Sequence, residues 1–518
     1  MKLKNIFSFA LLFVAALFMS CSDSDDNNAA TGLTITNDGV TIESLSMPLG
    51  ESSVMLGVNT DAEWTVSVPE ADASWISVTP HEGYGWNISD STASNYRSYF
   101  KVTTKKNVEA PRTSTLTITA GGLTKVITVN QAGISGNDDG HESAWEMVEN
   151  FVLGYNLGNT MESNPYASWW KPEEKTVADW EKAWGQPQVT KETIQTLKAK
   201  GFNVLRLPVT WYPHIAKFSK TYTKDEDYAI DAAWMARVKE IVKMINDEGM
   251  YCIVNIQHDA GANNGSGDPN SAWLHADNDY ENVTKIYQAI WKQIATELKD
   301  FDDKVIFESF NEILNAKSSW TAPAAGDVAY ETINKLQQDF VNVVRATGGN
   351  NEYRNLLISS YADGGSSDVA VNALAVPTDT HPNHICATFH SYDPYWFCNG
   401  NRHKEGESAA EKKKIDEEEM YYIYDFGDDQ KAEIKAIFNR IDKKCGSLGI
   451  PYFFGEFGAI GDHPEMTERT KYADYVTSLC NEYKTAAFWW MGLLDRSTNT
   501  WLENEAPIVD ALVKNRVK

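Results

Sequence analysis

Strand and helix patterns alternate along most of this 518-residue chain, from about residue 144 to its end. Short runs rich in β-branched and aromatic residues predict eight strands, near residues 151–156, 203–207, 251–256, 305–311, 355–360, 384–390, 452–456 and 486–491. Helical periodicity fills the intervals, for example at 190–200, 231–248, 280–299, 328–346, 429–445 and 466–483. Gly201 and Gly249 stand where C-terminal helix caps are expected. Eight strands joined by crossover helices predict a (β/α)8 barrel over residues 144–518.

Residues 33–133 have a different texture, because short alternating segments follow one another with almost no helical period. Trp64 to Val68 and Lys125 to Val129 are typical, and turns rich in glycine, proline and asparagine separate such segments. We expect a small all-β, immunoglobulin-like sandwich there, ahead of the α/β barrel. Residues 22–32 predict a flexible tether, and residues 134–143 predict a linker.

The N-terminus has the features of a targeting signal. Lys2 and Lys4 precede an apolar run, Ile6 to Met19, that is too short to span a bilayer comfortably. Cys21 follows this run and resembles the lipidated cysteine of a bacterial lipobox, and the acidic residues after it resemble the export signal of surface lipoproteins in Bacteroidetes-like bacteria. We therefore expect residues 1–21 to be a lipoprotein signal peptide and Cys21 to anchor the protein in the outer membrane, exposed at the cell surface. Ordinary signal cleavage is the alternative.

The net charge of −26 argues against nucleic acid and anionic membrane surfaces as partners, because phosphate binding needs clustered lysine and arginine. A neutral polysaccharide is compatible with this charge and with the 17 tryptophans and 23 tyrosines, although core packing is the simpler account of the aromatic residues. No cluster of histidine, cysteine or aspartate has the spacing of metal ligands, so we expect no metal and no cofactor. We also expect a monomer.

Five cysteines follow Cys21, and their odd number and irregular spacing predict no disulfide framework. Cys252 and Cys386 lie within apolar strand patterns and are predicted to be buried thiols. One disulfide among the other three stays open at this point.

Two predicted strands end in a glutamate, Glu312 on the fourth and Glu456 on the seventh. In a parallel barrel the C-terminal ends of the strands face the active site, so the two carboxylates should meet there. Retaining glycosidases hold such a pair roughly 5–5.5 Å apart, one carboxylate as nucleophile and the other as general acid/base. The pair therefore predicts cleavage of glycosidic bonds.

The fourth strand carries a further carboxylate. Its period of two predicts Glu308, Phe310 and Glu312 on one face, aimed at the barrel interior. A buried glutamate needs a partner, and Arg206 at the end of the second strand is the candidate.

Six motifs in order give the chain a specific resemblance. They are GYNLGNT at Gly154–Thr160, AWGQP at Ala183–Pro187, GFNVLRLPVTW at Gly201–Trp211, FESFNE at Phe307–Glu312, HSYDPY at His390–Tyr395 and GEFG at Gly455–Gly458. This set resembles glycoside hydrolase family 5 over nearly all of residues 144–518, and the first two motifs resemble its subfamily 4. In the sandwich, Trp64, the segment Ser74–Val78, Arg112 and the closing Val129–Gly133 resemble the BACON module found beside carbohydrate-active enzymes.

The resemblance implies a role for each central residue. Glu312 matches the acid/base, Glu456 matches the nucleophile, and Asn311 matches the residue that binds the sugar 2-hydroxyl. An acid/base must hold a proton at rest, so we expect burial and the charge of Glu456 to raise the pKa of Glu312. We expect Arg206 and the Tyr392 hydroxyl to keep Glu456 ionised.

Further substrate contacts are predicted around this pair. His390 orients the acid/base or a sugar hydroxyl, with a hydrogen-bonded core histidine as the alternative. Relatives often have two adjacent histidines after the third strand, but here the pair is Gln257 and His258, which predicts a retained mechanism with altered pH dependence or sugar preference. Trp490 is predicted to form the floor of the cleavage subsite, with Trp489 packing outward. The residues predicted to bind the substrate are Asn156, Arg206, Gln257, His258, Asn311, His390, Tyr392 and Trp490.

The activity expected from these residues is that of a retaining, endo-acting β-1,4-glucanase on xyloglucan, mixed-linkage glucan or cellulose-type chains. The same mechanism on β-mannan or xylan is the second hypothesis. A non-catalytic, surface glycan-binding lipoprotein is the third, and the paired glutamates argue against it because a binding protein needs neither. The sandwich is predicted to be a spacer or a glycan-binding module, with the spacer favoured.

Overall fold

The computed structural model describes residues 29–516, apart from residues 38, 86–97, 108–109, 132, 134–139, 168, 263–267, 278, 404–407 and 462. Its described residues form two compact units. The first unit ends at Val129 and leaves out residues 46–52 and 104–112, and the second unit holds those two segments and everything from Asn130 onward.

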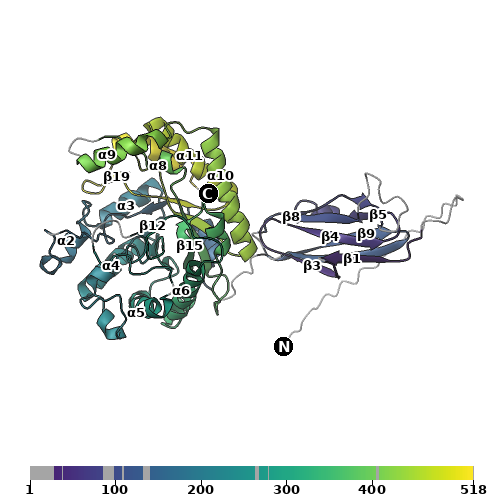
Figure 1. The fold of residues 1–518 in the computed structure, drawn as a ribbon, viewed down its shortest axis with the longest axis horizontal. Helices are drawn as coiled ribbons and strands as arrows, with labels where there is room; N and C mark the ends of the chain where they lie inside the picture. Colours follow the sequence, from purple (N-terminus) through teal and green to yellow (C-terminus); the bar gives the residue numbers. More distant parts are fainter. Residues whose placement is uncertain are drawn as a thin grey trace, which may run out of the picture. The chain divides into compact units, whose positions relative to one another are not determined.

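The N-terminal strands form two five-stranded sheets, drawn in purple and blue in Figure 1. One sheet has the order β2-β1-β4-β8-β6 and the other has the order β3-β10-β9-β5-β7. The strands are β1 (Leu33–Asn37), β2 (Val40–Thr41), β3 (Ser44–Met47), β4 (Ser52–Thr60), β5 (Trp64–Ser67), β6 (Ile76–Thr79), β7 (Glu82–Gly83), β8 (Tyr99–Thr104), β9 (Arg112–Ala120) and β10 (Leu123–Gln131). Alternate residues such as Leu116 and Ile118 are fully buried, which is the pattern of sheets with one face on a core. The predicted all-β sandwich is confirmed.

The second unit contains a closed barrel of eight parallel strands in chain order, which confirms the predicted (β/α)8 architecture. The strands are β11 (Gly154–Asn156), β12 (Val204–Leu207), β13 (Tyr251–Val254), β14 (Val305–Glu308), β15 (Leu356–Gly364), β16 (Ile385–Ser391), β17 (Tyr452–Phe457) and β18 (Ala487–Trp489). Closure is direct, because β11 pairs with both β12 and β18. A small hairpin of β19 (Leu494–Asp495) and β20 (Thr500–Trp501) follows the last barrel strand.

Helices surround the barrel, as α4, α5 and α6 do in Figure 1. The helices are α1 (Ala144–Asn150), α2 (Val177–Glu181), α3 (Lys191–Lys200), α4 (Ala232–Asp247), α5 (Tyr280–Leu298), α6 (Val328–Arg345), α7 (Asp368–Ala373), α8 (Tyr395–Cys398), α9 (Ala409–Glu418), α10 (Asp428–Leu448), α11 (Met466–Tyr483) and α12 (Ala506–Lys514). Gly201 caps α3 with φ +110°, and Gly249 follows α4 with φ +73°, as predicted. None of the described helices has the length and apolar character needed to cross a membrane.

The barrel interior is layered. An apolar cluster contains one or more residues from seven of the strands and from α1: Ala144, Met147, Val148, Phe151, Val204, Tyr251, Ile253, Ile306, Leu357, Cys386, Phe453, Ala486 and Phe488. Side chains alternate along a strand, so Arg206 and Glu308 lie on the same inward face as Val204 and Ile306, one step nearer the strand C-termini. The apolar cluster therefore supports a polar layer that opens toward the βα-loops.

Both predicted connectors contain residues that contact a folded unit. Of the predicted tether, residues 22–28 lie outside the described part, and Thr31 donates to Asp61 of the sandwich through its N–H at 2.8 Å and its hydroxyl at 2.5 Å. Of the predicted linker, His141 Nδ1 lies 2.9 Å from Asp303 Oδ1 of the barrel unit. Cys21 lies outside the described residues, and the later cysteines Cys252, Cys386, Cys398, Cys445 and Cys480 are all buried and free.

Candidate active site

Arg206 is the centre of the polar layer. Its side chain is fully enclosed, and its Nε and Nη2 donate to the two oxygens of Glu308 at 2.6 and 2.8 Å. Its Nη1 donates to Glu456 Oε1 at 2.6 Å. Burial lowers the pKa of Arg206, but the charges of Glu308 and Glu456 outweigh burial and raise that pKa above its ordinary value. One guanidinium therefore holds two buried carboxylates, and the predicted partnership with Glu308 is present.

Three amide side chains complete the shell of Arg206. Asn311 and Asn156 accept hydrogen bonds through Oδ1 at 2.8 and 3.1 Å, and Gln257 accepts a longer one at 3.5 Å. Asn156 and Arg206 have no exposed surface, and Asn156 Nδ2 donates to the carbonyl of Gly455 at 2.9 Å. Both residues were predicted to contact the substrate. That contact stays a prediction, and in the structure both residues orient the groups around them.

Glu456 lies within β17 near its C-terminal end. Its Oε2 accepts a hydrogen bond from the Tyr392 hydroxyl at 2.8 Å, opposite the bond from Arg206 to Oε1. Burial raises the pKa of Glu456, although the positive charges of His390 and Arg206 oppose this effect. The carboxylate is thus held from both sides, and the predicted partners Arg206 and Tyr392 are the two donors.

Glu312 is not on the strand from which it was predicted to project. Strand β14 ends at Glu308, and Glu312 has left-handed backbone torsions with φ +43°. Phe310 lies outside the barrel interior, with its ring 6.3 Å from that of Tyr287 on α5. The predicted common face of Glu308, Phe310 and Glu312 is therefore wrong, because alternation ends where the strand ends.

The turn places Glu312 against His390 of β16. Glu312 Oε1 lies 2.9 Å from His390 Nδ1, and the same nitrogen lies 3.7 Å from Glu456 Oε2. One side-chain oxygen each of Glu312 and Glu456 and a ring nitrogen of His390 all lie within 4.8 Å of one another. The two carboxylates thus share a histidine and are close to each other.

The pKa of Glu312 differs from the expectation. Burial acts to raise it, but the hydrogen bond from His390 and the positive charges of His390 and Arg206 lower it below its usual value. Burial lowers the pKa of His390 in turn, but Glu456, Asp363 and Glu312 raise it to about 9. The resting proton is therefore held by the histidine of the Glu312–His390 pair.

The remaining predicted residues are arranged around this centre. Gln257 is nearly buried, and its Oε1 accepts from Asn255 at 2.6 Å. His258 is half-buried, with its ring 5.3 Å from that of Trp184. Burial lowers the pKa of His258 to about 4, so its imidazole is neutral at physiological pH.

The two tryptophans that end β18 differ in their surroundings. Trp489 is 1% exposed, and its ring lies 5.2 Å from that of Phe457 at an interplanar angle of 85°. Trp490 is half-buried beside Gly158, where an added Cβ would lie 3.0 Å from the indole. Trp490 is thus the tryptophan with an accessible face, and Gly158 allows the close approach.

Asp363 is a site residue that sequence reasoning missed. It lies near the end of β15, its Oδ2 accepts the backbone N–H of Glu312 at 2.7 Å, and it is fully buried. The available signal was an aspartate directly before Gly364 and Gly365, shortly after the fifth predicted strand. That pattern alone does not separate a site carboxylate from an ordinary turn residue.

A family model described as cellulase, glycosyl hydrolase family 5, matches residues 165–492. The chain belongs to glycoside hydrolase family 5. A second model, BACON, described as a putative binding domain, matches residues 62–132, so both predicted family resemblances are confirmed.

Relatives and solved structures agree with the family. Cellulase/esterase CelE of Acetivibrio thermocellus is 31% identical over 389 residues, which are 72% of this chain and 40% of that longer protein. The xyloglucan-specific endo-beta-1,4-glucanase BoGH5A of Bacteroides ovatus is 27% identical over 529 residues, which cover 95% of this chain and 93% of that protein. The crystal structure of PbGH5A of Prevotella bryantii B14, in complex with a xyloglucan tetradecasaccharide, has a TM-score of 0.60 at 34% identity and covers 72% of this chain and 99% of that one.

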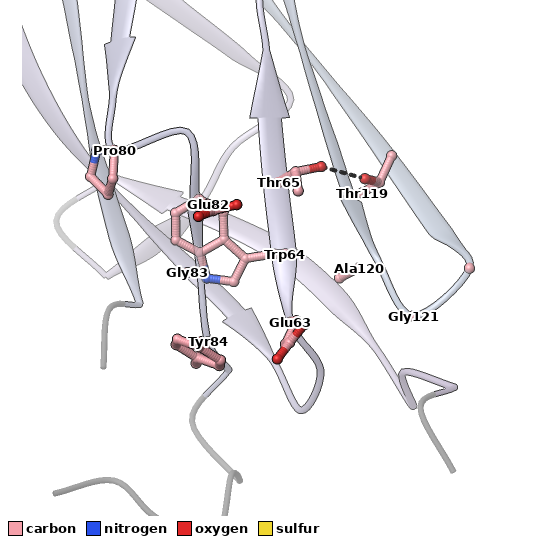
Figure 2. Close-up of a pocket in the computed structure, with 11 residues that line it drawn as sticks. Glu63, Trp64, Thr65, Pro80, Glu82, Gly83, Tyr84, Thr119, Ala120 and Gly121 are labelled. Carbon is pink, nitrogen blue, oxygen red and sulfur yellow. Dashed lines mark hydrogen bonds between the residues drawn. The ribbon is translucent and has the colours of Figure 1, made fainter. Parts of the chain in front are cut away.

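The BACON module has a hollow of its own, of about 610 Å³, between β5, β7 and the end of β9 (Figure 2). Figure 2 shows Glu63 and Glu82 at this hollow and the hydrogen bond between the Thr65 and Thr119 hydroxyls, which is 2.8 Å long. Trp64 is only 1% exposed, so it packs in the core and offers no open ring face. The hollow of the sandwich therefore presents no open tryptophan ring, whereas Trp490 at the barrel site is only half-buried.

Proposed function

We propose that this family 5 enzyme cleaves β-1,4-linked glucan backbones internally, with retention of configuration, by double displacement. The observation that carries the proposal is the pair Glu312 and Glu456, which have side-chain oxygens within 4.8 Å of each other at the C-terminal end of the barrel. A retaining pair is typically about 5–5.5 Å apart, whereas an inverting pair needs roughly 6.5–9.5 Å to admit a water molecule.

Glu456 acts as the nucleophile in this proposal. It attacks the anomeric carbon and forms a covalent glycosyl-enzyme, so it must be ionised and must be aimed at that carbon. The bonds from Arg206 and Tyr392 restrain both of its oxygens and favour the charged form. Burial opposes ionisation, and this makes the two donors necessary.

Glu312 acts as general acid and then as general base. Before the sugar binds, His390 holds the proton of the pair, and Glu312 accepts the hydrogen bond from Nδ1. A bound sugar excludes water and disfavours the separated charges, so the proton moves along this bond to Glu312, which delivers it to the leaving oxygen. Glu312 then takes a proton from the water that hydrolyses the glycosyl-enzyme.

Xyloglucan is the substrate we propose to test first. BoGH5A is named for this polysaccharide, and PbGH5A was crystallised with a xyloglucan tetradecasaccharide. In this proposal His258, Gln257 and Trp490 contact the sugar nearest the cleaved bond. Asn311, which is 2% exposed, would reach the 2-hydroxyl.

We also propose that the enzyme is a surface lipoprotein with Cys21 as its anchor. The supporting features are the short apolar run and the cysteine that ends it. The sandwich then acts as a spacer between the membrane and the barrel. The hollow of Figure 2 supports a spacer rather than a sugar platform, because its tryptophan is buried.

Digestion of a polysaccharide panel tests the activity. Xyloglucan, mixed-linkage glucan, carboxymethyl cellulose, galactomannan and xylan would each be incubated with enzyme, and the products would be separated by chromatography while NMR follows the new anomeric centre. We expect oligosaccharides from the glucans, with β configuration first. Products from mannan or xylan alone would reject the glucan assignment, and a first product of α configuration would reject retention.

A further inference from the structure

Two left-handed turns face each other at the ends of β14 and β15. Glu312 has φ +43° and Asp363 has φ +50°, a conformation that residues other than glycine seldom adopt. The turns are joined twice, since Asp363 Oδ2 accepts the N–H of Glu312 at 2.7 Å and the N–H of Ala362 donates to the carbonyl of Ile313 at 3.0 Å. The backbone that carries Glu312 therefore depends on the Asp363 side chain.

Asp363 also faces the histidine that is bonded to Glu312. The same oxygen, Oδ2, lies 3.6 Å from His390 Nε2. In the described residues neither His390 Nε2 nor Asp363 Oδ1 has a hydrogen-bond partner, although both atoms are buried. One carboxylate oxygen each of Glu308 and Asp363 and one ring nitrogen of His390 lie within 4.8 Å of one another. A small adjustment of either side chain would turn this approach into a charge-assisted hydrogen bond.

We propose that Asp363 is a positioning residue for acid catalysis: it holds the turn that aims Glu312 and supplies the negative charge that keeps the proton on the Glu312–His390 pair. This inference rests on the proposed function, in which that proton goes to the leaving group. Asp363 touches neither the sugar nor the cleaved bond in this scheme, and it acts only through Glu312 and His390.

Two other carboxylates lie near His390, but on a different side of its ring from Asp363. Glu312 and Glu456 face Nδ1 at 2.9 and 3.7 Å, so they lie on the opposite side of the ring from Asp363. Glu456 is also bound by Arg206 and by the Tyr392 hydroxyl, which compensate its charge.

Two other titratable side chains belong to this site. Glu308 is bound by both arms of the Arg206 fork, and His258 has its pKa lowered by burial and is neutral. Asp363 Oδ2 lies 3.6 Å from Nε2. Burial raises the pKa of Asp363 to about 7, although the charge of His390 opposes this effect, so the Asp363 carboxylate is ionised along the alkaline limb of the pH profile. Removing its charge should therefore weaken the hold of the pair on its proton more than a distant charge change would.

Two variants separate the two parts of the role. Asp363→Asn keeps an oxygen to accept the Glu312 N–H and removes the charge, whereas Asp363→Ala removes both. The assay is kcat/KM against pH on xyloglucan and on dinitrophenyl cellobioside, whose leaving group needs no proton. Asp510→Asn is the matched control, because it removes a carboxylate that is 75% exposed on α12.

For Asp363→Asn we expect the alkaline limb on xyloglucan to move to lower pH by about one unit or more, since a protonated His390 loses a neighbouring negative charge. The sign follows because the proton-bearing pair is the active form, and it is lost as pH rises. For Asp363→Ala we expect a loss of about 10- to 100-fold on xyloglucan and a change of only a few-fold on dinitrophenyl cellobioside.

An alkaline limb of Asp363→Asn at the wild-type position would overturn the proposal, and so would equal losses on the two substrates for Asp363→Ala. If Asp363→Ala fails to fold, as judged by circular dichroism, the limb of Asp363→Asn decides alone. Glu312→Gln is assayed beside them to separate the two levels of inference. Retained xyloglucan hydrolysis by Glu312→Gln would refute the proposed function itself. If Glu312→Gln loses this activity but the alkaline limb of Asp363→Asn stays at the wild-type position, only the role of Asp363 is refuted.

Discussion

Replacing Arg206 by methionine should damage both stability and catalysis. The guanidinium is fully enclosed, and the side chain of Glu308 beside it is 1% exposed. Among the described residues, the Glu308 carboxylate accepts hydrogen bonds from Arg206 alone, through both oxygens. Methionine fills a similar volume but leaves Glu308 and Glu456 buried without a cation. Removing one partner of a buried ion pair costs about 3–5 kcal/mol of unfolding free energy, because the remaining charge is uncompensated.

That free energy corresponds to a fall in melting temperature of about 4–6 °C for a domain of this size. The loss of the donor to Glu456 should lower kcat/KM on the order of 100- to 1000-fold, as removal of a preorganised charge typically does. Differential scanning calorimetry and xyloglucan hydrolysis measure the two effects. Arg402→Met is the matched control, since the Arg402 side chain is 48% exposed and its pair with Glu465 should be worth less than about 1 kcal/mol.

A double-mutant cycle tests the reasoning further. Glu308→Gln removes the charge that Arg206→Met would leave unpaired, so the double variant should be more stable than the sum of the single effects predicts, by about 0.5–3 kcal/mol. A melting temperature within 1 °C of wild type for Arg206→Met would refute the account. Strict additivity in the cycle would show that the two residues do not act as a pair.

Three further predictions follow from the proposed roles. Glu456→Gln should abolish turnover while the circular dichroism spectrum stays that of the wild type, and substantial remaining hydrolysis would reject Glu456 as nucleophile. Glu312→Ala should slow cleavage of glucans by about 10²- to 10⁴-fold yet spare the first step on dinitrophenyl cellobioside. Added azide should then give a β-glycosyl azide by NMR, and an α adduct would contradict retention. Cys21→Ala should move the protein from the membrane fraction to the soluble fraction in a sedimentation assay, and continued membrane association would require another anchor.

The local sequence pattern was sufficient to predict the strands and helices that form the framework of this protein. The runs that predicted strands at 203–207 and 452–456 correspond to β12 (Val204–Leu207) and β17 (Tyr452–Phe457), and the predicted helix at 466–483 is α11 to the residue. These elements follow from hydrophobic period and capping, which depend on residues a few positions apart. Eight strands that alternate with helices predict a closed parallel barrel. The strand ends that carry Arg206 and Glu456 could therefore be predicted to lie on the same face of that barrel.

Contacts across the barrel were beyond that reasoning. The approach of His390 to Glu312 joins residues 78 positions apart, and the bond from Glu312 to Asp363 joins residues 51 apart. Both depend on a left-handed turn after β14 that strand alternation does not foresee. The degree of burial was equally beyond the sequence pattern, since Asn156 was predicted to contact the substrate and has no exposed surface in the structure.

The protonation of the site was decided by tertiary structure for the same reason. Residue types alone predicted a raised pKa for Glu312, because two carboxylates repel each other when buried. The folded chain also brings the hydrogen bond from His390 and the positive charges of His390 and Arg206 to Glu312, and these outweigh burial and lower the pKa. Sequence thus determined which groups stand at the strand ends, whereas the distances among them, which set every electrostatic energy, exist only in the closed barrel.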